Sequence, residues 1–271
     1  MADKRLTPAR PDLAASSLKG QVEAARFVDG EEAGVAWGRV SLRAGPSYDS
    51  GQVSELLFGE IVTVYERKDG WAWLQAKTDS YVGYARESGL GPTVEADAHV
   101  IQLLTPLLSA PDVKSPLRDL LALNARVKRG RQEKNFVAVA DGFLSVRALA
   151  PLADVAPDFV AVAERFIGVP YVWGGKTLQG LDCSGLIQAS LQAAAIACPR
   201  DTDMMEQRLG HAVTRDQIKR GDLIFWKGHV GVMRDAQTLL HANAFHMQVA
   251  SESLDAAIAR IDTPITSIKR L

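Results

Sequence analysis

The chain has 271 residues, of which 47% are hydrophobic, and its 31 Lys and Arg residues nearly balance its 32 Asp and Glu residues. This length and composition are typical of a folded protein with one large domain or two to three small ones, and they exclude a largely disordered chain. Because neither charge is in excess, the sequence does not favour a nucleic acid or an anionic membrane as the partner. We expect a small or neutral partner.

The cysteine content and the N-terminus bear on the compartment. Cys183 and Cys198 are the only cysteines, so at most one disulfide is possible, and we expect both to be reduced. The first 21 residues, MADKRLTPARPDLAASSLKGQ, contain charges and prolines where a signal peptide needs an apolar stretch. No later segment reaches about 18 consecutive apolar residues. We therefore expect a cytoplasmic protein with no membrane partner, and export after removal of a signal stays open.

Residues 31–93, which follow an N-terminal extension of residues 1–30, read as short strands broken by turns. Apolar and polar residues alternate with a period of two at residues 61–65, and Asp69-Gly70 is typical of a hairpin turn. This pattern predicts a small all-β barrel.

Residues 94–152 read as a weaker copy of the same pattern. AGPSYDSGQVSELLFGEIVTV aligns with SAPDVKSPLRDLLALNARVKR, GWAWLQA with NFVAVAD, and YVGYARESGL with GFLSVRALAP. Two tandem barrels are the economical interpretation, and both resemble bacterial SH3-like domains, the second more weakly. A single irregular β domain is the alternative.

The pattern changes after a proline-bounded linker, PLADVAP, at residues 151–157. APDFVAVAERFIGVP has the periodicity of an amphipathic helix, and a second helix is predicted to begin at Asp182. Four strand-like segments follow, LIFW, HVGVM, LLHANA and QVAS. Helices followed by an antiparallel sheet predict an α+β domain at residues 153–271, and the chain as a whole is predicted to be a multidomain protein.

Cys183 lies in GLDCSGLIQASL, at the point where a glycine turn becomes an apolar helix. Asp182 is a good N-cap, which places Cys183 in the first helical turn. The backbone N–H groups and the helix dipole favour a thiolate there, so we predict a nucleophile. The alternative is a small apolar residue at the start of a buried helix. Cys198 precedes a proline, and we expect it to be structural.

Two histidines are predicted to lie near this cysteine. His229 in KGHVGVM and His241 in LLHANA would lie directly opposite each other if the hairpin loop between them is centred on Asp235. They could then supply a base and the group that orients it. Zinc held by Cys183 and both histidines is an alternative, but the close CxxC or HxxxH spacing is missing. The other histidines are expected to be packed or surface residues: His99, His211 and His246.

The segments PYVWGGKTLQGLDCSGLIQAS, PRDT, RGDLIFWKGHVGVM and LLHANA, in this order, resemble the NlpC family of cell-wall cysteine peptidases. The resemblance covers roughly residues 157–271 and implies a papain-like fold with no cofactor or metal. It implies that Cys183 is the nucleophile, that His229 is the general base and that His241 orients His229. It also implies that the Tyr171 hydroxyl and the backbone N–H of Cys183 line the oxyanion pocket.

Two SH3-like domains before such a catalytic domain resemble a narrower group of enzymes. Its members cleave the bond between γ-D-Glu and the diamino acid in free muropeptides that begin with L-Ala, and the first barrel closes one end of their groove. The resemblance implies a role in cell-wall recycling and a peptidoglycan peptide as substrate. It implies that polar groups receive the substrate's α-ammonium: Asp182, Ser184, Asp201 and Thr202, with Glu55 and Tyr81 from the barrel and Tyr84 as the alternative to Tyr81.

Other functions stay open at this point. The barrels could make the chain chiefly a wall-binding module, and the papain-like domain could serve as an amidase, an acyltransferase or a wall hydrolase outside the cytoplasm. The products formed from defined muropeptides would distinguish these functions. We expect a monomer, and either meso-diaminopimelate or Lys as the diamino acid.

Overall fold

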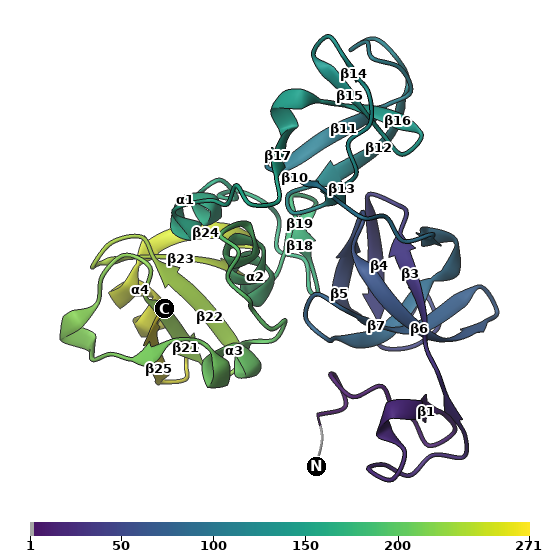
Figure 1. The fold of residues 1–271 in the computed structure, drawn as a ribbon. Coiled ribbons are helices and arrows are strands. Elements are labelled where there is room, and N and C mark those ends of the chain that lie inside the picture. The colour runs from purple at the N-terminus through teal and green to yellow at the C-terminus, as the bar shows by residue number, and fades with distance from the viewer. Residues whose placement is uncertain (1–2) are drawn as a thin grey trace. The chain divides into compact units, whose positions relative to one another are not determined.

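The computed structural model describes residues 3–271, and Figure 1 shows their fold as a ribbon. The chain divides into two compact units, of which the first ends at Ala153 and the second is Asp154–Leu271. All four α-helices of the described residues lie in the second unit. Within residues 3–271, no helix is both long enough and apolar enough to cross a membrane.

The first unit begins with a segment that packs against the first barrel. Its strands β1 (Ala14–Ala15) and β2 (Phe27–Val28) pair in parallel, and the short 3-10 helix η1 (Ser16–Leu18) follows β1. Leu13 is fully buried. The backbone carbonyl of Arg5 accepts a 2.7 Å hydrogen bond from the backbone N–H of Val82. This segment is therefore a packed part of the first unit.

Residues 31–91 form a small β barrel, a seven-stranded sheet in the order β5-β4-β8-β7-β6-β3-β9. The predicted Asp69-Gly70 turn is confirmed, because Lys68 pairs with Trp71 across it and the turn residues have φ values of 51° and 74°. Such values are those of a two-residue type I′ hairpin. The elements are β3 (Glu31–Val35), β4 (Arg39–Arg43), β5 (Gln52–Leu57), β6 (Ile61–Lys68), β7 (Trp71–Ala76), β8 (Val82–Arg86), η2 (Glu87–Gly89) and β9 (Leu90–Gly91).

Residues 98–151 form a second β subdomain with its own apolar core, into which Phe58 of the first barrel inserts. At Gly59, φ is 75° and a Cβ would lie 1.9 Å from the carbonyl oxygen of Arg126, so this contact requires glycine. The elements are β10 (Ala98–Val100), β11 (Leu104–Leu108), β12 (Leu117–Ala122), β13 (Arg126–Val127), β14 (Gln132–Glu133), β15 (Phe136–Val139), β16 (Gly142–Ser145), η3 (Val146–Ala148) and β17 (Leu149–Pro151).

The two β subdomains share one strand arrangement. In each, a bulged hairpin, β4–β5 or β11–β12, joins a later strand through one residue pair, Arg43 with Tyr84 or Leu108 with Phe143. A 3-10 helix then leads into the last strand. The sequence alignment matched Tyr84 with Ser145, whereas the structure matches it with Phe143. The shift arises because β15 and β16 are joined by a tight turn and β7 and β8 by a longer loop.

The second unit is an α+β domain on a six-stranded antiparallel sheet in the order β20-β25-β21-β22-β23-β24. Helix α2 packs against α1, β22 and β23, and α4 packs against β23 and β24. The elements are α1 (Phe159–Glu164), β18 (Lys176–Thr177), β19 (Gly180–Leu181), α2 (Cys183–Ala193), α3 (Thr202–Arg208), β20 (His211–Ala212), η4 (Arg215–Gln217), β21 (Leu223–Trp226), β22 (His229–Met233), β23 (Thr238–Asn243), β24 (Gln248–Ser253), α4 (Leu254–Arg260) and β25 (Ile265–Arg270).

Candidate active site

Cys183 is the first residue of α2, and Asp182 is the N-cap, as the sequence predicted. Asp182 caps the helix by accepting a 2.6 Å hydrogen bond on Oδ1 from the backbone N–H of Gly185. The Cys183 side chain is buried, with Sγ 3.8 Å from Oγ1 of Thr202 and hydrogen-bonded to the backbone of Val230. Because Val230 follows the first residue of β22, the sulfur lies beside the start of the strand that carries His229.

The Cys183 thiol is less acidic than the sequence predicted. Burial raises the pKa of this thiol, and the negative charge of Asp182 raises it further. The hydrogen bonds from Thr202 and Val230 act in the opposite direction without reversing the shift. The helix-dipole argument failed because it left out the cost of desolvating the thiolate. A proton must therefore pass from the sulfur to a base before or during attack.

Asp182 has a buried partner, Arg200, that the sequence reasoning missed. Arg200 is only 1% exposed and donates two hydrogen bonds to the carboxylate, 3.0 Å from Nη1 to Oδ1 and 2.7 Å from Nη2 to Oδ2. The carboxylate also accepts hydrogen bonds from the backbone N–H groups of Gly174 and Gly185 and from the Ser184 hydroxyl. The arginine of the PRDT segment was the available signal, because a buried guanidinium needs a carboxylate.

This network includes Asp182 and Ser184, the two residues at the start of α2 that were predicted to receive a substrate amine. Five donors engage the Asp182 carboxylate, and Oγ of Ser184 accepts a 2.8 Å hydrogen bond from Arg200. These side chains join the start of α2 to the neighbouring loops, and their contact with a substrate amine remains a prediction. Asp201 and Thr202 remain candidates: Asp201 is half-buried at the N-cap of α3, and Thr202 contacts Cys183.

His229 and His241 contact each other through a register that differs from the predicted one. The loop of this hairpin was predicted to be centred on Asp235. In the structure Val232 pairs with Leu240, which places the centre of the loop one residue later. Continuing this pairing leaves His229 two residues away from the position opposite His241, so the contact is diagonal. The two side chains still share a face, and Nε2 of His229 lies 2.8 Å from Nδ1 of His241.

Gly231 explains how a diagonal contact can be this short. The continued register places it opposite His241, and a Cβ there would lie 2.8 Å from Cδ1 of Leu239 and 3.2 Å from Cβ of His241. Both distances are shorter than ordinary van der Waals contact. Glycine at this position therefore leaves the space that lets the two imidazoles meet.

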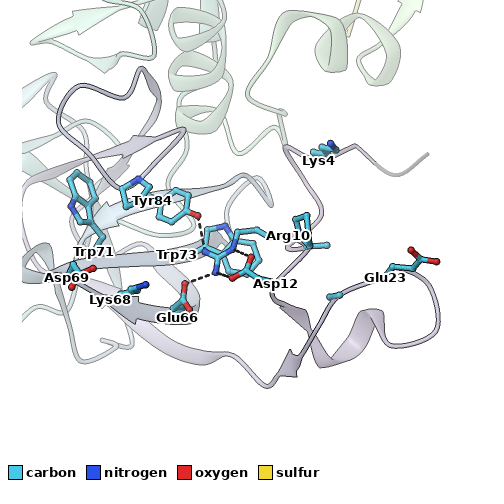
Figure 2. A pocket seen from close by; sticks show the side chains of 14 residues that line it. Lys4, Arg10, Asp12, Glu23, Glu66, Lys68, Asp69, Trp71, Trp73 and Tyr84 are labelled. Carbon is cyan, nitrogen blue, oxygen red and sulfur yellow. Dashed lines mark hydrogen bonds and ion pairs between the residues drawn. The ribbon is translucent and has the colours of Figure 1, made fainter.

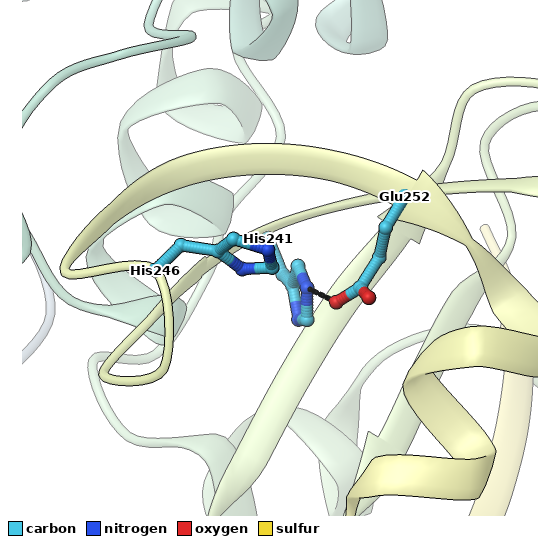
Figure 3. Close-up of side chains that lie close together, drawn as sticks. All are labelled: His241, His246 and Glu252. Carbon is cyan, nitrogen blue, oxygen red and sulfur yellow. Dashed lines mark hydrogen bonds and ion pairs between the residues drawn. The ribbon is translucent and has the colours of Figure 1, made fainter.

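Glu252 extends this pair and was not found from the sequence. Its Oε1 lies 2.8 Å from Nε2 of His241, and it forms an ion pair with Arg260 of α4. Figure 3 shows Glu252 and His246 on either side of the His241 ring. Only the register of β24, which pairs Leu239 with Glu252, brings the carboxylate onto the histidine face.

Both histidines are neutral at physiological pH. Burial, together with the charges of His241 and Arg260, lowers the pKa of His229 to about 3. Burial also lowers the pKa of His241 to about 4, although the hydrogen bond to Glu252 raises it in part. The free site therefore contains a neutral imidazole beside a thiol, and the proton of Cys183 can be accepted by His229.

Tyr171 lies near the sulfur of Cys183. It forms an isolated β-bridge with Leu181, the residue directly before the N-cap of α2. Burial raises the pKa of Tyr171 to about 12, and the charges of Cys183 and Asp182 contribute to the shift. The phenol is therefore protonated and can donate a hydrogen bond. Its predicted role in the oxyanion pocket fits this position and remains a prediction.

The structure contains a group of residues with metal-ligand spacing. Its members are not the set considered from the sequence, which was Cys183 with His229 and His241. Among the described residues, His241, His246 and Glu252 each place one ligand atom within 4.8 Å of the others, without Cys183 (Figure 3). Both ring nitrogens of His241 are already hydrogen-bonded, and Arg260 places a positive charge on Glu252. These contacts favour a hydrogen-bonded relay over a cation site.

The barrel residues predicted to contact substrate lie in covered positions. Glu55 in β5 is 1% exposed and pairs with Arg39, and Tyr81 is 5% exposed. Tyr84, the alternative to Tyr81, accepts a 2.9 Å hydrogen bond from Nη1 of Arg10. It lines a cleft of about 1150 Å³ between the N-terminal segment and the first barrel (Figure 2). Tyr84 is thus engaged in a contact within the first unit.

The remaining cysteine and histidines contribute no group to the relay. Cys198 is buried, and its thiol donates a 3.3 Å hydrogen bond to the carbonyl of Pro199. His99 lies in β10, and His211 is exposed in β20. His246 is a packed residue whose ring lies 6.5 Å, centroid to centroid, from that of His241.

The fold and the cysteine–histidine–histidine site together define a papain-like cysteine peptidase. The NlpC/P60 family model matches residues 168–262, and the model of the bacterial dipeptidyl-peptidase SH3 domain matches residues 42–90. The chain thus contains an NlpC/P60 hydrolase domain and, before it, a bacterial SH3 domain, which confirms the resemblance seen in the sequence.

Full-length relatives support this assignment. The chain is 26% identical over 241 residues to dipeptidyl-peptidase 6 of Lysinibacillus sphaericus, covering 79% of this chain and 89% of that protein. It is 26% identical over 223 residues to γ-D-glutamyl-L-lysine dipeptidyl-peptidase of Bacillus subtilis, covering 74% and 75%. A crystal structure of an NlpC/P60 family protein from Bacillus cereus matches with a TM-score of 0.74 at 20% identity, covering 89% and 99%, and shows the same fold.

Proposed function

We propose that this peptidase hydrolyses the bond between γ-D-Glu and the diamino acid of peptidoglycan stem peptides, and that it prefers free peptides that begin with L-Ala. The observation that carries the catalytic part is the 2.8 Å contact between His229 and His241 beside the helix-start cysteine. The substrate part is supported by a relative named γ-D-glutamyl-L-lysine dipeptidyl-peptidase, which aligns along 74% of the chain.

The reaction follows from the protonation states. As Sγ of Cys183 attacks the amide carbonyl, its proton passes to His229, whose Nε2 is held by His241. The backbone N–H of Cys183 and the protonated Tyr171 would stabilise the oxyanion. His229 then returns the proton to the leaving amine of the diamino acid, and water, activated by the same imidazole, hydrolyses the thioester. Atoms and charge balance without a cofactor.

Recognition of the L-Ala ammonium is assigned to a smaller set than the sequence predicted. Asp201 is the catalytic-domain carboxylate that we propose for it, with Thr202 beside the nucleophile. Glu55 and Tyr81 remain our candidates from the barrel. An ammonium taken out of water needs such a carboxylate, because an unpaired buried charge is costly.

Two further assignments belong to this proposal. We propose that residues 98–151 are a second SH3-like domain, because their strand arrangement repeats that of the first barrel. We also propose that the products enter cell-wall recycling in the cytoplasm, which a preference for free peptides would support. Fractionation of cells that express the natural gene would test the compartment.

Mass spectrometry of digests tests the proposed function. L-Ala-γ-D-Glu-diamino acid should be cleaved after D-Glu, whereas the N-acetylated peptide and the glycan-linked stem peptide should be cleaved about a hundredfold more slowly, the consequence of leaving carboxylates without their cation. Comparable cleavage of all three would replace the recycling role by wall hydrolysis. Release of ammonia or transfer of the acyl group to an added amine, without hydrolysis, would replace the peptidase by an amidase or acyltransferase.

A further inference from the structure

The histidine pair is the inner part of a longer chain of contacts that crosses four elements of the second unit. Nε2 of His229 lies 2.8 Å from Nδ1 of His241, and Nε2 of His241 lies 2.8 Å from Oε1 of Glu252. Oε1 of Glu252 also pairs with the guanidinium of Arg260. Strand β22 thus supplies the base, β23 its partner, β24 the carboxylate and α4 the terminal cation.

The outer members of this chain are progressively more exposed. The side chain of His241 is 0% exposed, that of Glu252 15% and that of Arg260 24%. Arg260 is further held by the face of Phe245, whose ring centroid lies 4.3 Å from its Cζ. Because Arg260 holds the same carboxylate oxygen that His241 contacts, Glu252 can accept a proton donor in only a few orientations.

The order of donors and acceptors along the chain follows from Glu252. A carboxylate paired with a guanidinium accepts hydrogen bonds, so the proton on the neutral His241 ring is at Nε2. Nδ1 of His241 is then an acceptor, and Nε2 of His229 must donate to it. A neutral His229 with its proton on Nε2 leaves Nδ1 unprotonated. This nitrogen is the one left to take the proton from Cys183.

We propose that Glu252 is a positioning residue that sets the tautomer of His229 through His241, and that Arg260 is a positioning residue that holds Glu252. This inference goes beyond the proposed substrate and rests only on the cysteine-peptidase chemistry of the proposed function. Without Glu252, the His241 proton can move to Nδ1. The N–H group at Nδ1 would then face the N–H group at Nε2 of His229, which favours the His229 tautomer with its proton on Nδ1. In that tautomer His229 cannot accept the proton of Cys183.

Nitrogen-15 NMR of the histidine rings tests this assignment without any substrate. In the Cys183→Ala protein at neutral pH, His229 and His241 should both carry their proton on Nε2. Glu252→Gln should convert both rings to mixtures of tautomers, and Glu164→Gln, which removes a carboxylate paired with arginines elsewhere in the unit, should not. Unchanged tautomers in Glu252→Gln, or a Glu252-dependent bound metal in the native protein, would overturn the proposal.

Kinetics with a peptide substrate supply the second readout. Glu252→Gln should lower kcat about tenfold or more with little change in KM, and Arg260→Gln should lower it less. In a protein that already carries His241→Asn, where no tautomer is left to fix, Glu252→Gln should cost almost nothing. An equal loss in both backgrounds would show that Glu252 acts structurally and would overturn the proposal.

The two readouts separate this inference from the proposed substrate. Should the native protein fail to cleave γ-D-Glu peptides, the NMR tautomers still decide the role of Glu252. Should Glu252→Gln fold poorly, Arg260→Gln provides an independent variant, in which the tautomer signals should shift in the same direction and Arg260→Lys should restore them. Native-like signals in Arg260→Gln would show that Arg260 does not help to set the tautomers.

Discussion

Nε2 of His229 lies 2.8 Å from Nδ1 of His241, although the two residues are diagonal in the β22–β23 ladder. In the proposed mechanism His229 takes the proton and His241 only orients it, so His229→Ala should lose nearly all activity. His241→Asn can still accept the hydrogen bond and should keep part of it. The measurement is kcat/KM for a stem peptide. The costs of the two substitutions should also be smaller in combination than their sum, because the residues act as a unit.

Two equally inactive single variants would contradict this division of roles. If in addition the native protein carried stoichiometric zinc that both variants lose, the metal alternative would take its place.

Cys198→Ala is the matched control for Cys183→Ala. Both thiols are buried, but Cys183 is hydrogen-bonded to Val230 in β22 whereas Cys198 donates to the carbonyl of Pro199, so Cys198→Ala should keep most of the activity.

Gly231→Ala should impair catalysis without unfolding the protein. A Cβ at this position would lie 2.8 Å from Cδ1 of Leu239, which must move, and 3.2 Å from Cβ of His241, which must give by a few tenths of an ångström. Because misplacing a catalytic group by about 1 Å can cost on the order of a hundredfold, we expect kcat to fall at least tenfold. Gly51→Ala, where no atom lies within 4 Å of the added Cβ, is the control. Native kcat in Gly231→Ala would show that glycine is not needed there.

Arg200→Met should destabilise the second unit strongly. It leaves the Asp182 carboxylate buried without its cation, which typically costs about 3–5 kcal/mol in the free energy of unfolding. The double variant Asp182→Asn/Arg200→Met should recover part of this loss, because no charge is then stranded. Urea titrations measure both. A loss below about 1 kcal/mol for Arg200→Met would mean that the ion pair does not hold the site together.

Acidification should weaken the fold through the two histidines. Their folded pKa values of about 3 and about 4 lie below the ordinary value of 6.5. Between these limits the unfolded chain binds more protons than the folded one, so stability rises with pH and is lost as pH falls from about 6.5 toward 3. Urea midpoints at several pH values would show the slope. His229→Gln should flatten it, and an unchanged slope would contradict the burial of a neutral imidazole.

The sequence contained the local features of the site and lacked the distant ones. The N-cap at Asp182 and the helix start at Cys183 depend on neighbouring residues, so composition and spacing predicted them. The Asp69-Gly70 hairpin was readable for the same reason. The exact pairing of β22 with β23 was not, because a shift of the loop centre by one residue leaves the apolar pattern of both strands acceptable.

Contacts between distant segments could not be predicted from the sequence alone. Arg200 pairs with Asp182 across 18 residues, and Glu252 meets His241 only because β24 pairs in one particular register. The direction of the Cys183 pKa shift was wrong because it depends on how many atoms cover the sulfur, which no local pattern reports. The hydrogen bonds of Arg200 to Asp182 and Ser184 were missed on the same ground.

In the proposed mechanism, Cys183 forms a covalent acyl intermediate with the part of the peptide that ends in γ-D-Glu. Acid quenching during turnover of L-Ala-γ-D-Glu-diamino acid, followed by mass spectrometry of the digested protein, tests this claim most directly. Such an intermediate would appear as an L-Ala-γ-D-Glu thioester on the peptide that contains Cys183, absent from Cys183→Ala and unaffected in Cys198→Ala. Turnover with no adduct on Cys183, or an active Cys183→Ala protein, would contradict it.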